Sequence, residues 1–132
     1  MTTTTPKVIL VVEDHPQNLE LVTDLLESAG YRVLTAPTAE EGLELTRAHR
    51  PDLILMDVRL PGLDGLQATK MLKDDPATQT IPVIALTAYA MPEDRERIRD
   101  AGCDGYLTKP LKIPLLLEQL NTYLGQRTSR VM

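Results

Sequence analysis

Five short apolar runs recur along the chain, and the stretches between them are long enough for helices. The runs cover residues 8–12, 31–34, 53–56, 81–86 and 105–107. Two of them, VILVV and LILM, are apolar throughout instead of alternating with polar residues. Continuous apolar strands are typical of a parallel sheet that helices cover on both faces. The pattern therefore predicts an α/β fold in three α/β/α layers, with five strands that alternate with helices.

Local signals mark where the helices begin and end. Pro16 suits the first turn of a helix that Gly30 is placed to end. Thr38 and Glu41 form a T-x-x-E capping box, which opens a second helix. The remaining helices are expected over Leu66, Thr69, Met71 and Leu72, from Pro92 to a stop at Gly102, and over 115–124.

Composition limits the class of protein. A chain of 132 residues with 42% hydrophobic residues fits one domain, expected over 7–124 with loose tails at 1–6 and 125–132. The net charge of -5 argues against direct nucleic-acid binding. No apolar run approaches the roughly 18 residues of a membrane span, and no signal peptide is present, so we expect a cytoplasmic protein. The single cysteine, Cys103, cannot form an internal disulfide.

Polar residues follow four of the predicted strands. Glu13 and Asp14 come after the first, Asp57 after the third, Thr87 after the fourth and Lys109 after the fifth. Ligands bind at the carboxyl ends of the strands in open parallel sheets. If the strand order is 2-1-3-4-5, the three acids converge on one pocket. Two carboxylates about 4 Å apart repel by roughly 4 kcal/mol at an effective dielectric near 20, so the pocket requires a cation beyond the one lysine.

Oxygen donors of this kind favour a hard divalent ion, Mg²⁺ or Mn²⁺ in its place. His15 adjoins the acids but precedes Pro16, and we interpret it as a loop residue. A divalent ion, a hydroxyl and a lysine are the groups that hold a phosphoryl group during transfer, and a carboxylate can accept that group. Asp57 is the candidate nucleophile because it ends the middle strand, and Glu13 and Asp14 are the candidate metal ligands.

The motifs VVEDHP, LILMDVRLPGLDG, ALTA and YLTKP, in this order and spacing, resemble those of receiver domains of two-component response regulators. The resemblance covers 7–124 and implies a CheY-like, flavodoxin-like parallel sheet of five strands in the order 2-1-3-4-5, with five helices. It implies that Asp57 is the phosphoacceptor and that Thr87 and Lys109 bind phosphoryl oxygens. The implied metal ligands are Glu13, Asp14, Asp57 and the backbone carbonyl of Arg59.

The resemblance also implies a switch. Receivers hold the bond equivalent to Lys109–Pro110 in cis. Tyr106 stands at the family's switch aromatic: Thr87 moves toward the phosphoryl group and Tyr106 turns into the space that it leaves. The fourth helix, fifth strand and fifth helix would then repack. The segment 85–110 resembles stand-alone DivK-type receivers and receivers of hybrid kinases more than it resembles CheY.

We therefore expect a single-domain response regulator, a signalling protein and not an enzyme in the ordinary sense, although it assists its own phosphorylation and dephosphorylation. Its phosphodonor would be a histidine kinase or a histidine phosphotransfer protein, and its output a protein contact. It would be a monomer or a weak phosphorylation-dependent dimer. A role as intermediate or phosphate sink in a phosphorelay remains open. A fragment of a larger hybrid protein is a further alternative, against which Met1 and the trailing tail argue.

Two enzyme classes fit less well. A flavodoxin-like electron carrier would place EDHP where it repels the flavin phosphate. An aspartate-nucleophile phosphatase needs an acid two residues after the nucleophile, where Arg59 stands.

Ordinary structural roles remain open for each residue taken singly. Glu13 and Asp14 can cap the first helix, Asp57 can begin an Asx-turn, and Tyr106 can be a core residue. The charged run 93–100 is either a solvated helix face or an output surface. A helix needs fewer apolar residues for one buried stripe than stand at Ile113, Leu115, Leu116 and Leu117. The excess indicates contact with a partner or a second copy.

Overall fold

Five parallel strands form one sheet in the computed structural model, which describes residues 6–88 and 91–125. The strands are β1 (Val8–Val12), β2 (Arg32–Ala36), β3 (Leu53–Asp57), β4 (Val83–Thr87) and β5 (Gly105–Thr108). Their order is β2-β1-β3-β4-β5, which confirms the order that the receiver resemblance implied. Residues 1–5 and 126–132, which make up most of the expected tails, lie outside the described residues.

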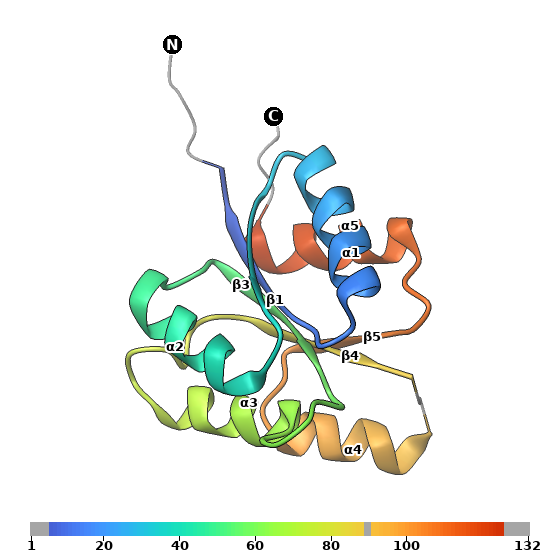
Figure 1. Cartoon of the computed structure of the whole chain (residues 1–132). Helices are drawn as coiled ribbons and strands as arrows, with labels where there is room; N and C mark the ends of the chain where they lie inside the picture. The colour runs from blue at the N-terminus through green and yellow to red at the C-terminus, as the bar shows by residue number, and fades with distance from the viewer. Residues whose placement is uncertain (1–5, 89–90, 126–132) are drawn as a thin grey trace.

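Helices cover both faces of the sheet. They are α1 (Pro16–Ser28), α2 (Ala39–His49), α3 (Gly65–Asp74), α4 (Pro92–Asp100) and α5 (Ile113–Leu124). Figure 1 shows α1 and α5 on one face and α2, α3 and α4 on the other, so the predicted three-layer α/β/α arrangement is confirmed. Among the described residues, no helix has the length and apolar character that a membrane span requires.

Several boundaries differ from the prediction. The second strand lies at Arg32–Ala36 instead of 31–34, and the fourth begins at Val83 instead of residue 81. Because β2 is an edge strand, it carries exposed Arg32 and Thr35, so its apolar run is shorter than the strand itself. The fifth helix begins two residues early, at Ile113, because a proline such as Pro114 is tolerated in a first turn.

Caps at the helix ends were predicted in part. Gly30 follows α1 with φ +97°, a backbone conformation that favours glycine. The Thr38 hydroxyl accepts from the Glu41 N–H at 3.1 Å, but the structure forms only this half of the predicted capping box. A complete capping box that was not predicted opens α3: Asp64 accepts from the Gln67 N–H at 2.8 Å, and the Gln67 side chain accepts from the Asp64 N–H at 3.4 Å.

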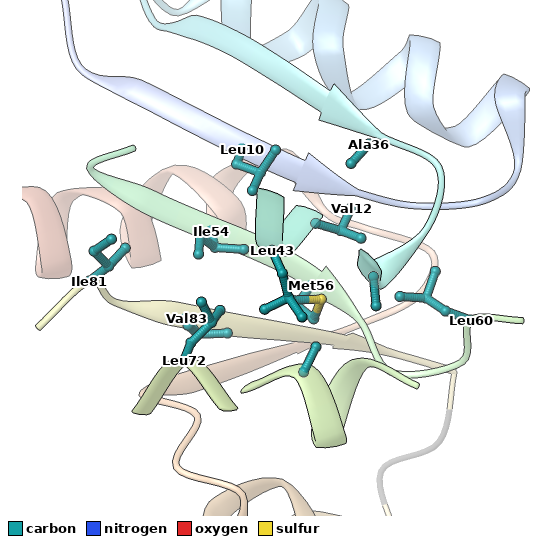
Figure 2. Packing of buried hydrophobic residues seen from close by; sticks show 12 residues of the cluster. Leu10, Val12, Ala36, Leu43, Ile54, Met56, Leu60, Leu72, Ile81 and Val83 are labelled. Atoms are coloured by element: carbon teal, nitrogen blue, oxygen red, sulfur yellow. The ribbon is translucent and has the colours of Figure 1, made fainter. Parts of the chain in front are cut away.

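The core has one layer on each side of the sheet, and all its described buried hydrophobic residues are Leu, Ile, Val, Ala or Met, as composition predicted. Figure 2 shows Leu10, Ile54 and Met56 facing Leu43 of α2 and Leu72 of α3. The opposite layer contains Ile9, Val11, Leu53, Leu55, Ile84, Leu86 and Leu107, packed against Val22, Leu26, Leu116 and Leu120 of α1 and α5. Successive residues therefore face opposite layers, which explains why β1 and β3 are apolar throughout.

Candidate functional site

Strand order brings the polar residues together at the carboxyl edge of the sheet. Val12 of β1 pairs with Met56 of β3, so the residues that follow them, Glu13 and Asp57, lie beside each other. On the other side, Asp57 pairs with Leu86 of β4. Lys109 comes directly after β5, the next strand along. Residues far apart in the sequence thus meet at one site, as expected for a parallel sheet.

The Lys109 ammonium lies between two carboxylates. Its Nζ atom is 2.9 Å from Asp57 Oδ2 and 3.1 Å from Glu13 Oε1. The side chains of Glu13 and Asp57 are only 2% and 5% exposed, whereas that of Lys109 is 25% exposed. Buried carboxylates need a partner of opposite charge, and Lys109 is a partner for both. The Lys109–Pro110 bond, at the start of the following loop, is cis, as in the receivers that the sequence resembles.

The second oxygen of each buried carboxylate accepts a backbone hydrogen bond. Asp57 Oδ1 accepts from the Arg59 N–H and Glu13 Oε2 from the His15 N–H, both at 3.1 Å. The Asx-turn considered for Asp57 is therefore present, but it engages only one of the two oxygens. The helix-capping role considered for Glu13 is not formed, because the N-cap of α1 is His15 and no side chain caps this helix.

The charges of the site shift each other's pKa. Burial raises the pKa of the Asp57 carboxyl, Lys109 lowers it and the charge of Glu13 raises it, so that the pKa stays above its ordinary value. Burial also raises the pKa of Glu13, but the His15 N–H and the Lys109 ammonium more than offset this and leave the pKa lowered. Burial lowers the pKa of Lys109, and its two carboxylate partners raise it above its ordinary value.

Asp14 faces a cavity beside these residues. The cavity has a volume of about 560 Å³, and Asp14, Arg59 and Thr87 line it together with Asp94 and Arg97 of α4. Its further lining residues are His15, Val58, Leu60, Pro61, Asp64, Leu66 and Ile98. Space for a ligand therefore lies next to the carboxyl edge, under α4, and it is bordered by residues from the ends of β1, β3 and β4.

Thr87 and Tyr106 lie on the same face of the sheet. Tyr106 pairs with Ala85 of β4, two residues before Thr87, and alternate residues of a strand point to one side. Tyr106 is half-buried and packs against a cluster that includes Ile98 of α4. Thr87 and Tyr106 therefore both lie on the side of the sheet that α4 covers.

The donor set fits a divalent cation. Glu13, Asp14 and Asp57 offer carboxylate oxygens, and one ammonium offsets only one of these three negative charges. Donor atoms of Glu13, Asp14 and His15 lie within 4.8 Å of one another. His15 is not among the metal ligands that the sequence predicts, because Pro16 after it indicates a plain loop. The signal that could have included it was its position directly after two acids.

Known proteins with similar sequences are regulators. The family model described as the response regulator receiver domain matches residues 9–121. The polar-differentiation response regulator DivK of Brucella anthropi is 49% identical over 120 residues, which cover 91% of this chain and 98% of that protein. The DivK protein of Brucella ovis is 48% identical over 119 residues, 90% of this chain and 97% of that protein.

Solved structures agree in fold. The receiver domain of the sensor histidine kinase PA1611 from Pseudomonas aeruginosa, solved with a magnesium ion coordinated in its active-site cleft, matches with a TM-score of 0.86 at 38% identity. The match covers 92% of this chain and all of that one. The chemotaxis protein CheY4 of Vibrio cholerae matches with a TM-score of 0.86 at 29% identity, over 91% of this chain and all of that one.

Proposed function

Because this chain belongs to the response regulator receiver domain family, we propose that Asp57 accepts a phosphoryl group from a phosphohistidine of a sensor kinase or a histidine phosphotransfer protein. The observation that carries the proposal is the Lys109 ammonium, which lies 2.9 Å from Asp57 and 3.1 Å from Glu13 at the carboxyl edge of the sheet. The protein then acts as a signalling protein, in a domain that spans 7–124.

The transfer follows from ordinary phosphoryl chemistry. An oxygen of the Asp57 carboxylate forms a bond to phosphorus while the bond from phosphorus to the donor imidazole nitrogen breaks, and the imidazole, whose other nitrogen already carries a proton, leaves as the neutral ring. Lys109 and the Thr87 hydroxyl donate hydrogen bonds to the phosphoryl oxygens. These bonds to a charged acceptor are stronger than neutral ones and assist both formation and hydrolysis of the acyl phosphate.

Glu13, Asp14, Asp57 and the backbone carbonyl of Arg59 would hold Mg²⁺, or Mn²⁺ in its place. The bound ion supplies positive charge that offsets the phosphoryl oxygens and the crowded carboxylates. The magnesium ion in the PA1611 receiver supports this assignment. The negative charge of the carboxylates that Lys109 does not offset also supports the assignment of a magnesium site.

Signalling would proceed through the face formed by α4, β5 and α5. When Thr87 turns toward the phosphoryl group, Tyr106 moves into the space it leaves and α4 repacks. Moving such an equilibrium from 1:99 to 99:1 takes about 5.5 kcal/mol of differential stabilisation. On this face Ile113 and Leu115 are 46% and 47% exposed, whereas Leu116 is buried. The exposed Ile113 and Leu115 are candidates for contact with a downstream protein or with a second copy in a weak phosphorylation-dependent dimer.

The 49% identity to DivK favours a regulator of this type over a motor-control protein. A second role, as intermediate or phosphate sink in a phosphorelay, uses the same chemistry, and return of phosphoryl to a histidine phosphotransfer protein would identify it. A cytoplasmic location belongs to the proposal, and cell fractionation tests it. The flavodoxin-like and phosphatase alternatives lose their basis, because the chain belongs to the receiver family.

Replacing Asp57 with Asn tests the proposal. We expect the wild-type chain, given acetyl phosphate and Mg²⁺, to gain one phosphoryl group by intact mass, and Asp57→Asn to gain none. Asp24→Asn is a matched control, because Asp24 is exposed on α1. Uptake by Asp57→Asn at the same residue would overturn the assignment.

A further inference from the structure

The His15 side chain is 71% exposed, but its imidazole lies against the two acids that precede it. Its Nδ1 atom lies 3.5 Å from Glu13 Oε2 and 3.4 Å from Asp14 Oδ1. Three potential donor atoms, one nitrogen and two oxygens, therefore face one another, all within 4.8 Å. Three lone-pair donors in this arrangement are satisfied together by a proton or by a metal ion.

The backbone holds His15 in place from both sides. Its N–H donates to Glu13 Oε2 at 3.1 Å, and its carbonyl accepts from the Leu19 N–H at 2.9 Å. Pro16 restricts the residue before it to extended conformations, and His15 has φ -87° and ψ 115°. The imidazole is thus attached to a constrained backbone, which lowers the entropy cost of using it as a ligand.

The two carboxylate oxygens of Glu13 have different neighbours. Its Oε1 atom bonds to Lys109, while its Oε2 atom faces His15. The Lys109 bond orients the Glu13 carboxylate, as outer hydrogen bonds orient metal ligands in general. The Asp14 side chain is 31% exposed, so its carboxylate has room to turn toward a bound ion.

The types of donor atom indicate the kind of ion. Imidazole is a preferred ligand of Zn²⁺ and a poor one of Mg²⁺, which takes oxygen ligands. Carboxylate oxygens also bind Zn²⁺, at about 2.0–2.2 Å. One nitrogen and two oxygens therefore fit Zn²⁺ better than Mg²⁺.

We propose that Glu13, Asp14 and His15 form a site for Zn²⁺, with water as the remaining ligand, that overlaps the magnesium site. One ion excludes the other because both use the same carboxylates. Zn²⁺ would therefore inhibit phosphoryl uptake by Asp57, a consequence that rests on the function proposed above. The metal site itself does not depend on phosphorylation.

Zinc titration of the full chain tests the site. We expect His15→Asn to weaken Zn²⁺ binding at least tenfold by calorimetry while changing Mg²⁺ binding less than threefold. His49→Asn is the matched control, because His49 is the other histidine and is exposed at the end of α2. Co²⁺ should give the strong visible absorption of a tetrahedral site in the wild type and lose it in His15→Asn.

The outcomes separate this site from the proposed function. Equal Zn²⁺ affinity in the wild type and His15→Asn, or no Zn²⁺ binding by the wild type, would overturn the zinc site and leave the phosphoacceptor proposal intact. If wild-type Asp57 takes up no phosphoryl with Mg²⁺ while Zn²⁺ binding depends on His15, the phosphoacceptor proposal is overturned and the zinc site stands. Where both hold, Zn²⁺ should inhibit uptake in the wild type at least tenfold more effectively than in His15→Asn.

Discussion

At the scale of single residues, the site depends on one ammonium that serves two buried carboxylates. Lys109 lies within hydrogen-bonding distance of both Glu13 and Asp57, although it is 96 and 52 residues away from them in the sequence. A buried charge that loses its partner costs more than the pair contributes while intact. The free energy of unfolding of the metal-free protein should therefore depend strongly on Lys109.

Replacing Lys109 with Ala should lower the free energy of unfolding by about 2 kcal/mol without divalent ions, because two close carboxylates lose their shared cation. Urea denaturation in the presence of a chelator measures this. The loss should be smaller when Asp57→Asn is already present, since one of the two charges is then absent. Equal stability of Lys109→Ala and wild type would show that the carboxylates do not need the ammonium.

Cys103 offers a second test at this scale. Burial raises the pKa of its thiol to about 11. At a pH below this value the raised pKa leaves less thiolate, so alkylation at pH 8 should be about a hundredfold slower than in the unfolded chain. The rate should still be rising at pH 10. Mass spectrometry of iodoacetamide-treated protein, native and in denaturant, checks this, and equal rates would contradict it.

At the scale of elements, α3 is joined closely to the end of β3. Gly65, the first residue of α3, donates its N–H to the Val58 carbonyl at 3.1 Å. A Cβ atom there would lie 2.0 Å from the backbone oxygen of Asp57 and 3.0 Å from the Met56 side chain. Absence of a side chain at Gly65 thus lets the helix begin directly against the residue proposed as phosphoacceptor.

Gly65→Ala should destabilise the protein by about 3 kcal/mol, because the Asp57 backbone or α3 has to move to relieve the overlap. Phosphoryl uptake should fall as well. Gly42→Ala is a comparison at another close contact: the atoms nearest to its Cβ would belong to the Val12 side chain, at 2.9 Å, and a smaller loss is expected. Thermal unfolding of both variants measures the difference. A smaller effect at Gly65 than at Gly42 would be inconsistent with this packing.

At the scale of the whole molecule, the unbalanced charge at the sheet edge links metal binding to folding. An ion that binds only the folded chain stabilises it, by about 2.7 kcal/mol at a concentration one hundred times its dissociation constant. The carboxylates of Glu13 and Asp14 come from the end of β1, and Asp57 ends β3, so unfolding separates the ligands.

Mg²⁺ should therefore raise the melting temperature of the wild type, and Asp14→Asn should lose most of the increase. The reference sample contains NaCl at the same ionic strength, because screening alone weakens the repulsion among the acids. Differential scanning calorimetry with and without chelator measures the shift. Identical melting temperatures in Mg²⁺ and in NaCl would contradict the magnesium assignment.

The sequence by itself determined the alternation of strands and helices and the chemistry at the strand ends. Hydrophobic periodicity and end signals such as Pro16 and Gly30 act over a few residues, so they can be recognised without knowing the fold. Asp57 and Lys109 were identifiable for the same reason, since Asp57 directly follows an apolar run and Lys109 comes two residues after one. The bounds of β2 and the start of α5 were less predictable, because exposed polar residues shorten the apolar run of an edge strand and a proline can lie inside the first turn of a helix.

Only the tertiary structure decided which of these residues meet. Pairing of β1 with β3 places Glu13 beside Asp57, and this pairing joins strands that are not consecutive in the sequence. The sequence pattern made that order conditional, and the resemblance to receivers supplied it. Differences of a few tenths of an ångström decide whether His15 contacts Glu13 and Asp14. They also decide whether Gly65 fits against Asp57. Such distances follow from close packing of the whole molecule, which no local pattern of residues contains.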